Sequence, residues 1–296
     1  MRDCSATITR TDNSETMRTI NAVRNSSEIF AVFGNPIGHS LSPVMHNAAF
    51  KRMKINAHYV PFCVKNVEDA VRGIRGLDIR GVSITIPFKT EVMAYLDEVD
   101  ESSLRIGAIN TILNDHNGRL KGFNTDWSGL IRDLEESLEI RDKTFVILGA
   151  GGAARAAVYG ILEEGGIPII VNRGVERGEE MAREFGCSFH PLSEIGTIKA
   201  DCLINTTSVG MAPDSERSPV MREHLPNFRW VVDIVYNPLK TRLLRDAEEA
   251  GCMVLDGVGM FVHQGAEQTK IWTGKEPPRP LMRRVVLERL RERDGN

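Results

Sequence analysis

The sequence predicts an α/β fold made of two domains. Three observations predict it. From Glu28 onward, short β-rich runs alternate with helical stretches, which is the pattern of α/β proteins. Residues 144–148 form a continuous apolar run, as expected of a strand in a parallel sheet that is covered on both faces. The length of 296 residues also exceeds that of an ordinary single domain.

The first part of the chain has short predicted elements that end at turn signals. Gly34-Asn35-Pro36 breaks the first strand, and Pro87 ends an alternating run that we expect to be a strand leading into a loop. The predicted elements are strands at 29–33, 57–60 and 81–86 and helices at 43–53, 67–75 and 89–96.

From residue 144 the elements succeed one another as strand–helix–strand units, which is typical of a Rossmann-type nucleotide-binding domain with a parallel sheet. Two later helices have no sheet of their own, so we expect them to return to the first domain, which is then a discontinuous α/β substrate domain. The predicted strands are 144–148, 168–171, 202–205, 230–235 and 253–255. One predicted helix ends near 164, a second spans 176–185, a third ends near 272 and a fourth spans 280–291. The predicted domains are 28–127 with 260–296 for the substrate and 128–259 for the nucleotide, preceded by a leader or linker remnant at 1–27.

Composition argues against several classes of function. Lys and Arg total 37 against 40 Asp and Glu, a net charge of −3, which gives no electrostatic footprint for nucleic acid or a membrane surface. The five cysteines are odd in number and form no C-x-x-C, so we predict no zinc site or disulfide framework and a reducing, cytoplasmic location. The histidines, among them His39, His46, His58 and His263, lack metal-ligand spacing, so no metal is predicted.

A glycine-rich turn follows the apolar strand. Gly149-x-Gly151-x-x-Ala154 opens a helix, the context that a dinucleotide fingerprint requires. The first glycine permits a tight turn, the second lets backbone N–H groups approach a pyrophosphate, and the helix N-terminus favours negative charge. The alternative is a strand-to-helix turn without a ligand.

The end of the next strand indicates which dinucleotide is bound. An NAD enzyme usually has a carboxylate about 20 residues after the turn. Here Asn172 and Arg173 occupy that place, and Arg177 lies one turn later. Guanidinium groups suit a 2′-phosphate, so NADP is favoured. The alternative is an exposed arginine pair at a helix start.

Two polar groups in the first domain have both structural and functional interpretations. Ser42 is a good helix N-cap before Pro43, but hydroxyls of Ser40 and Ser42 at a helix start can also hold a carboxylate. Lys89 follows a strand end, and Asp126 precedes a helix that it could cap. An ammonium beside a carboxylate can stabilise charge on a carbonyl oxygen and deliver a proton while hydride reaches the carbon.

The order of these motifs resembles that of the shikimate dehydrogenase family. The matching stretches run through most of the chain, from about residue 29 to 272. They are 34–43, 83–89, 107–111, 124–126, 149–154, 172–173, 205–211, 233–236, 257–260 and Gln264.

The resemblance implies NADP-dependent reduction of 3-dehydroshikimate to shikimate in aromatic amino-acid and chorismate biosynthesis. It implies that Lys89 and Asp126 are the catalytic pair. The implied substrate-binding residues are Ser40, Ser42, Thr85, Lys89, Asn110, Asp126, Tyr236 and Gln264. The implied cofactor-binding residues are Gly149, Ala150, Gly151, Gly152, Ala153, Asn172, Arg173, Arg177, Ile234 and Gly257.

Two departures from the family pattern keep alternatives open. Gly174 stands where Ser or Thr is common after Asn-Arg, and Ser83 stands where Asn is frequent. The alternatives are a quinate/shikimate dehydrogenase that uses NAD and a sensor that binds shikimate or a dinucleotide without turnover. We expect a small-molecule substrate, no nucleic-acid or membrane partner, and a monomer or homodimer.

Overall fold

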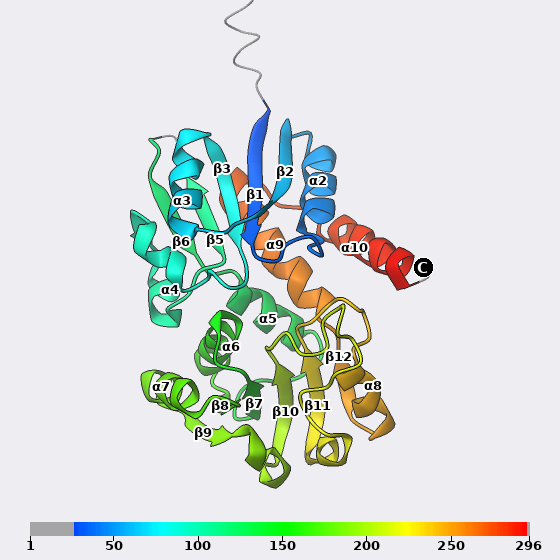
Figure 1. Cartoon of the computed structure of the whole chain (residues 1–296). Helices are drawn as coiled ribbons and strands as arrows, with labels where there is room; N and C mark the ends of the chain where they lie inside the picture. Colours follow the sequence, from blue (N-terminus) through cyan, green and yellow to red (C-terminus); the bar gives the residue numbers. More distant parts are fainter. Residues whose placement is uncertain (1–26, 116, 295–296) are drawn as a thin grey trace, which may run out of the picture.

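The computed structural model describes residues 27–115 and 117–294. Two six-stranded sheets lie one above the other in Figure 1, with helices α5 (Asp126–Glu135) and α9 (Val258–Thr273) between them. In the described part of the chain, no helix is both long and apolar enough to cross a membrane.

The first sheet has the strand order β2-β1-β3-β5-β6-β4. Strand β1 pairs in parallel with β2 and β3, whereas β5 pairs antiparallel with β3 and β6. The first sheet is therefore mixed rather than parallel throughout, because the connection from β5 to β6 spans only 115–119 and a parallel crossover needs about a dozen residues. The strands are β1 (Glu28–Gly34), β2 (Ala57–Cys63), β3 (Ile79–Ile84), β4 (Glu98–Val99), β5 (Thr111–Asn114) and β6 (Leu120–Phe123).

The helices of the first half are α2 (Ser42–Met53), α3 (Val67–Gly76) and α4 (Glu101–Ile106). The helix predicted at 89–96 is only a short 3-10 turn, η1 (Glu91–Tyr95). The turn ends at Leu96, which is extended. The Leu96 side chain packs in the space left by the missing side chain of Gly122, since a Cβ at 122 would lie 2.5 Å from Leu96 Cδ1. Packing on the sheet therefore overrides helix propensity here.

The second sheet confirms the predicted parallel architecture. Its order is β12-β11-β10-β7-β8-β9, and every neighbouring pair is parallel. Chain order reverses between β7 and β10, the place where open α/β sheets bind ligands. The strands are β7 (Thr144–Leu148), β8 (Ile167–Asn172), β9 (Ser188–Pro191), β10 (Ala200–Asn205), β11 (Phe228–Asp233) and β12 (Met253–Leu255); the helices are α6 (Gly152–Glu163), α7 (Val175–Phe185) and α8 (Arg242–Glu249), with 3-10 turns η2 (Leu192–Thr197) and η3 (Arg222–Asn227).

Alternate side chains of β7 are buried on opposite faces of this sheet. Phe145 and Ile147 pack in the cluster formed with α5 and α6, while Val146 and Leu148 pack in the cluster that includes α8. Two buried faces explain why the run is apolar without alternation.

The last two helices contact the first half of the molecule. Helix α10 (Arg279–Asp294) lies beside α2 in Figure 1, and Met45, Val262 and Val286 share one buried cluster. Helices α5 and α9 approach so closely that a Cβ at Gly129 would lie 2.8 Å from the backbone N of Gln264. Helix α9 therefore places side chains against both α5 and the first sheet.

Candidate active site

Lys89 lies where the first sheet faces the second. The chain leaves β3, and the backbone N–H of Ile109 donates to the Lys89 carbonyl at 2.8 Å. Phe88, next to it, is buried in the core of the first sheet. These contacts fix the backbone of Lys89 and leave its side chain 16% exposed.

Asp126 is the partner of Lys89. Lys89 Nζ lies 2.5 Å from Asp126 Oδ2, and the Asp126 side chain is 7% exposed. The carboxylate does not cap α5. Asn124 Oδ1 instead accepts from the backbone N–H groups of Asp126 and Trp127, at 3.0 and 3.4 Å. Because Asn124 satisfies the helix start, the Asp126 carboxylate is left to hold the lysine.

Asn110 holds the other carboxylate oxygen. Its Nδ2 donates to Asp126 Oδ1 at 2.8 Å and to Gln264 Oε1 at 3.4 Å. Its Oδ1 accepts from the Thr125 N–H at 2.8 Å. The structure thus brings together four of the predicted substrate-binding residues, Lys89, Asn110, Asp126 and Gln264.

Ser40, Ser42 and Tyr236 form a second group, at the start of α2. The Ser42 N–H donates to Ser40 Oγ at 3.3 Å. Burial raises the pKa of Tyr236, and hydrogen bonds with the Leu41 backbone and, more weakly, with Ser40 partly offset this shift. The Tyr236 ring stacks on Phe261 with 4.2 Å between centroids. The prediction that Ser42 is the N-cap is wrong: the cap is Leu41 and Ser42 is the first helical residue, so its hydroxyl is not used at the helix start.

Thr85 lies beside the loop that leads to Ser40. Its N–H donates to the Phe33 carbonyl at 3.0 Å, and a Cβ at Gly34 would lie 2.4 Å from Thr85 Cγ2. A glycine is therefore required at position 34 for the threonine to occupy this place. Thr85 makes no hydrogen bond to another predicted substrate-binding residue within the ranges described.

The glycine-rich turn contacts Lys89. A Cβ at Gly152 would lie 2.9 Å from Lys89 Cβ. Gly149 has a φ of +117°, a conformation that favours glycine. Helix α6 begins at Gly152, and none of the described side chains caps its first turn, so backbone N–H groups near Ala150, Gly151 and Ala153 are available to an anion.

Asn172, Arg173 and Arg177 lie at the end of β8 and the start of α7. Asn172 Nδ2 donates to the Gly174 carbonyl at 2.8 Å. Both arginines are exposed, and neither forms an ion pair with any residue that the structure describes. The pair therefore offers two guanidinium groups to a ligand bound at this edge.

Ile234 and Gly257 meet beside the same edge. A Cβ at Gly257 would lie 2.5 Å from the Ile234 carbonyl oxygen, so only glycine lets the two backbones approach this closely. Asp233, at the end of β11, accepts from Asn205 Nδ2, the Val235 N–H and Thr241 Oγ1 at 2.9, 3.0 and 2.7 Å. Burial raises its pKa to about 6. This network fixes the loop that carries Ile234.

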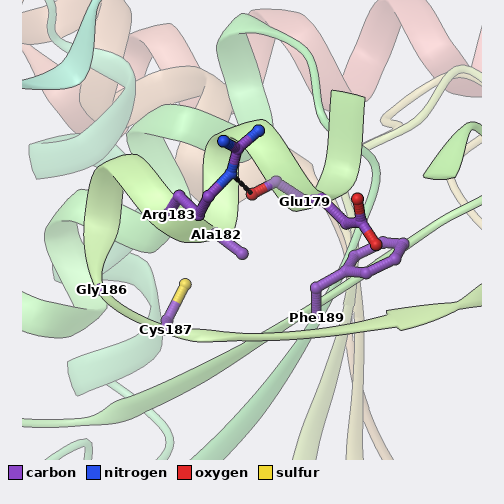
Figure 2. Close-up of a pocket in the computed structure, with 6 residues that line it drawn as sticks. All are labelled: Glu179, Ala182, Arg183, Gly186, Cys187 and Phe189. Atoms are coloured by element: carbon purple, nitrogen blue, oxygen red, sulfur yellow. Dashed lines mark hydrogen bonds between the residues drawn. The ribbon is translucent and has the colours of Figure 1, made fainter. Parts of the chain in front are cut away.

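A surface hollow of about 470 Å³ lies away from these groups, at the C-terminal end of α7. Figure 2 shows its lining, in which Arg183 Nε donates to the Glu179 carbonyl. Arg173 precedes the opposite end of α7. The hollow is therefore separate from the predicted cofactor edge, and it contains no acid–base pair comparable to Lys89 and Asp126.

Asp133, Glu136 and His263 form a cluster that sequence spacing did not indicate. Their ligand atoms lie within 4.8 Å of one another, because α5 and α9 bring them together. Asp133 Oδ2 accepts from the Met260 N–H at 2.9 Å, and His263 Nε2 lies 3.1 Å from Glu136 Oε1. These bonds join the two helices, which is a sufficient structural role.

Sequence reasoning did not assign roles to Tyr59, Thr111 or Gln268, which lie next to the site. Gln268 Nε2 donates to Thr111 Oγ1 at 3.0 Å, and Thr111 Oγ1 donates to Asn110 Oδ1 at 2.7 Å. A signal was present for Gln268, since it lies four residues after Gln264 and therefore on the same face of a helix.

Two stretches of the chain match known protein families. Residues 32–112 match the shikimate dehydrogenase substrate-binding domain, and residues 257–287 match the shikimate 5′-dehydrogenase C-terminal domain.

Complete relatives extend the match. A shikimate dehydrogenase (NADP(+)) of Pyrococcus furiosus is 44% identical over 274 residues, covering 92% of this chain and 99% of the relative. A crystal structure of a shikimate dehydrogenase with NADP+ superposes with a TM-score of 0.83 at 38% identity, covering 89% of this chain and 96% of the other. The Thermus thermophilus enzyme with NADP(H) and shikimate gives 0.81 at 36% identity, covering 88% and 99%.

Proposed function

The chain belongs to the shikimate dehydrogenase family, and on that premise we propose that it reduces 3-dehydroshikimate to shikimate, reversibly, with NADPH. The same premise makes it an oxidoreductase of aromatic amino-acid and chorismate biosynthesis. The observation that supports the reaction most strongly is the ion pair of Lys89 and Asp126, which lies directly against Gly152 of the glycine-rich turn.

Lys89 and Asp126 are the proposed proton-handling pair. As the ketone of the substrate is reduced, negative charge grows on its oxygen, and the Lys89 ammonium stabilises that charge and donates a proton to the oxygen. Asp126 orients the ammonium through their 2.5 Å contact. In the reverse direction the Lys89 amine accepts the hydroxyl proton.

The substrate carboxylate is proposed to bind the hydroxyls of Ser40 and Ser42, beside Tyr236. Asn110 and Gln264 are proposed to position the ring through the polar groups that face Asp126, and Thr85 to contribute from the neighbouring loop. Because Tyr236 follows β11 whereas Ser40 precedes α2, this subsite contains residues from both halves of the chain.

The residues around the second sheet fit NADP. The backbone N–H groups from Gly149 to Ala153 would hold the pyrophosphate, Asn172, Arg173 and Arg177 the adenosine end with its 2′-phosphate, and Ile234 and Gly257 would line the nicotinamide site. Two exposed guanidiniums without ion-pair partners, in the region the structure describes, support this assignment. When bound, the reduced cofactor supplies the hydride.

Steady-state assays of the full chain test the proposal. Shikimate and quinate are each supplied with NADP+ and with NAD+, and formation of reduced nicotinamide is followed by absorbance. We expect the largest kcat/KM for shikimate with NADP+. A larger value for quinate with NAD+ would instead identify a quinate/shikimate dehydrogenase, and tight binding of shikimate without turnover would identify a sensor.

The remaining predictions concern organisation. We propose that 28–127 and 260–296 form the substrate domain and 128–259 the nucleotide domain, supported by the packing of Val262 and Val286 with Met45. The predicted leader at 1–27 lies outside the described residues, except for Ser27. A monomer or homodimer in the cytoplasm remains our prediction.

A further inference from the structure

A buried chain of hydrogen bonds extends from Tyr59 to the catalytic pair. Tyr59 OH lies 2.6 Å from Ser83 Oγ, and Ser83 Oγ lies 2.8 Å from Gln268 Oε1. Gln268 Nε2 donates to the Asn110 carbonyl at 3.1 Å and to Thr111 Oγ1 at 3.0 Å. The chain continues through Asn110 to Asp126, and Tyr59, Ser83, Gln268, Thr111 and Asn110 are all buried.

The directions of the bonds at Gln268, Ser83 and Tyr59 follow from one backbone group. The Asn110 carbonyl can only accept, so the end of Gln268 that faces it must be the amide nitrogen, and the other end must be the oxygen. Ser83 must then donate to Gln268, and because its single proton is used, Tyr59 must donate to Ser83. Burial raises the pKa of the Tyr59 hydroxyl, which keeps that donor protonated.

Asn110 is fixed at the other end of the chain. The Thr125 N–H can only donate, so the Asn110 oxygen must face it. The Thr111 hydroxyl, which accepts from Gln268, has its proton free to donate to the same oxygen at 2.7 Å. The amide nitrogen of Asn110 is therefore turned toward Asp126 Oδ1, and Asp126 Oδ2 is left for Lys89.

We propose that Gln268 is a positioning residue for the reaction: it holds Thr111 and the Asn110 backbone so that Asn110 donates to Asp126 and Asp126 orients Lys89. Ser83 and Tyr59 orient Gln268 in turn. Ser83 thus has a defined place in this chain, although Asn is frequent at that position in the family. The inference rests on the proposed function, because its readout is the rate of that reaction.

Gln268→Met tests the proposal, since methionine fills a similar volume without the amide. We expect kcat with shikimate to fall about tenfold, while KM for NADP+ stays within about twofold because the cofactor residues lie around the other sheet. If Gln268 only supported the fold, the substitution would lower thermal stability but would not lower kcat while leaving KM for NADP+ unchanged.

Thr269→Val is the matched control. Thr269 is also fully buried on α9, and its hydroxyl bonds His46 Nδ1 and the Gly265 carbonyl, each at 3.0 Å, so its contact with the chain is indirect, through the His46 ring that stacks on Tyr59. We expect a loss of thermal stability comparable to that of Gln268→Met and a kcat within about twofold of the wild type. Wild-type kcat in Gln268→Met, or an equal fall of kcat in both variants, would overturn the inference. Absence of turnover in the wild type would instead refute the proposed function.

Discussion

Replacing Asp126 by Asn removes the negative charge of the proposed catalytic pair while keeping the shape of the side chain. Lys89 is 16% exposed and Asp126 7% exposed, and breaking a fully buried pair costs roughly 3–5 kcal/mol. Because Lys89 can turn toward water, we expect a smaller loss of unfolding free energy, about 2 kcal/mol, or a fall in Tm of about 5 °C for a chain of this size.

The effect on catalysis is expected to be larger. An amide nitrogen at position 126 would face the Lys89 ammonium, donor against donor, so the lysine would turn away from the substrate. A misplaced catalytic group of this kind costs about 10²-fold in kcat. The assay is steady-state turnover of shikimate with NADP+, with Tm measured on the same preparation.

Asp246→Asn is the control for loss of a carboxylate from an ion pair. Asp246 Oδ1 lies 2.8 Å from Arg242 Nε and its side chain is 9% exposed, but the pair belongs to α8. We expect about 1 kcal/mol of destabilisation and unchanged kcat. The reasoning is refuted if Asp126→Asn keeps kcat within about threefold of the wild type, or if both variants lose kcat equally.

Three further predictions concern the turn, the α5–α9 contact and the cofactor. Gly152→Ala places a Cβ 2.9 Å from Lys89 Cβ, so kcat should fall about tenfold by displacement of the lysine; turnover equal to the wild type would show that the contact is irrelevant. Burial raises the pKa of Asp133 to about 7 from 3.8, so the folded chain holds a proton that the unfolded chain releases, and stability falls as pH rises from about 4 to about 7. Asp133→Asn can still accept from the Met260 N–H but does not titrate, so its Tm should fall less than that of the wild type between pH 5 and 8. An equal fall of Tm in the two proteins would contradict the raised pKa of Asp133. Arg173→Gln should raise KM for NADP+ about tenfold and leave KM for NAD+ unaltered; a parallel rise for both cofactors would count against a 2′-phosphate contact.

The second sheet could be predicted from the sequence because its signals are local. The apolar run of β7, the glycine turn and the start of α6 follow one another directly, so strand, turn and helix each have their own pattern. The antiparallel β5 and β6 were not predicted. Each is four residues long, too short for a clear periodicity, and their pairing depends on the sheet that receives them.

The sequence predicts which residues belong to the site but not which of them contact one another. The sequence indicates Lys89 and Asp126 separately, whereas their pairing depends on Asn124 occupying the start of α5. The hydrogen-bond chain through Gln268 and Tyr59 was not predicted, because its members are far apart in the sequence. They come within 2.6–3.1 Å of one another only in the folded chain. Such networks leave little trace in a single sequence.

The most direct test of the account is the rate of hydride transfer in a single turnover of Lys89→Ala. Stopped-flow absorbance of reduced nicotinamide is recorded with saturating shikimate and NADP+, and NADP+ affinity is measured separately. We expect transfer to slow by about 10²–10⁴-fold while NADP+ affinity is retained. Transfer at the wild-type rate would contradict the proposal that the ammonium at position 89 handles the proton.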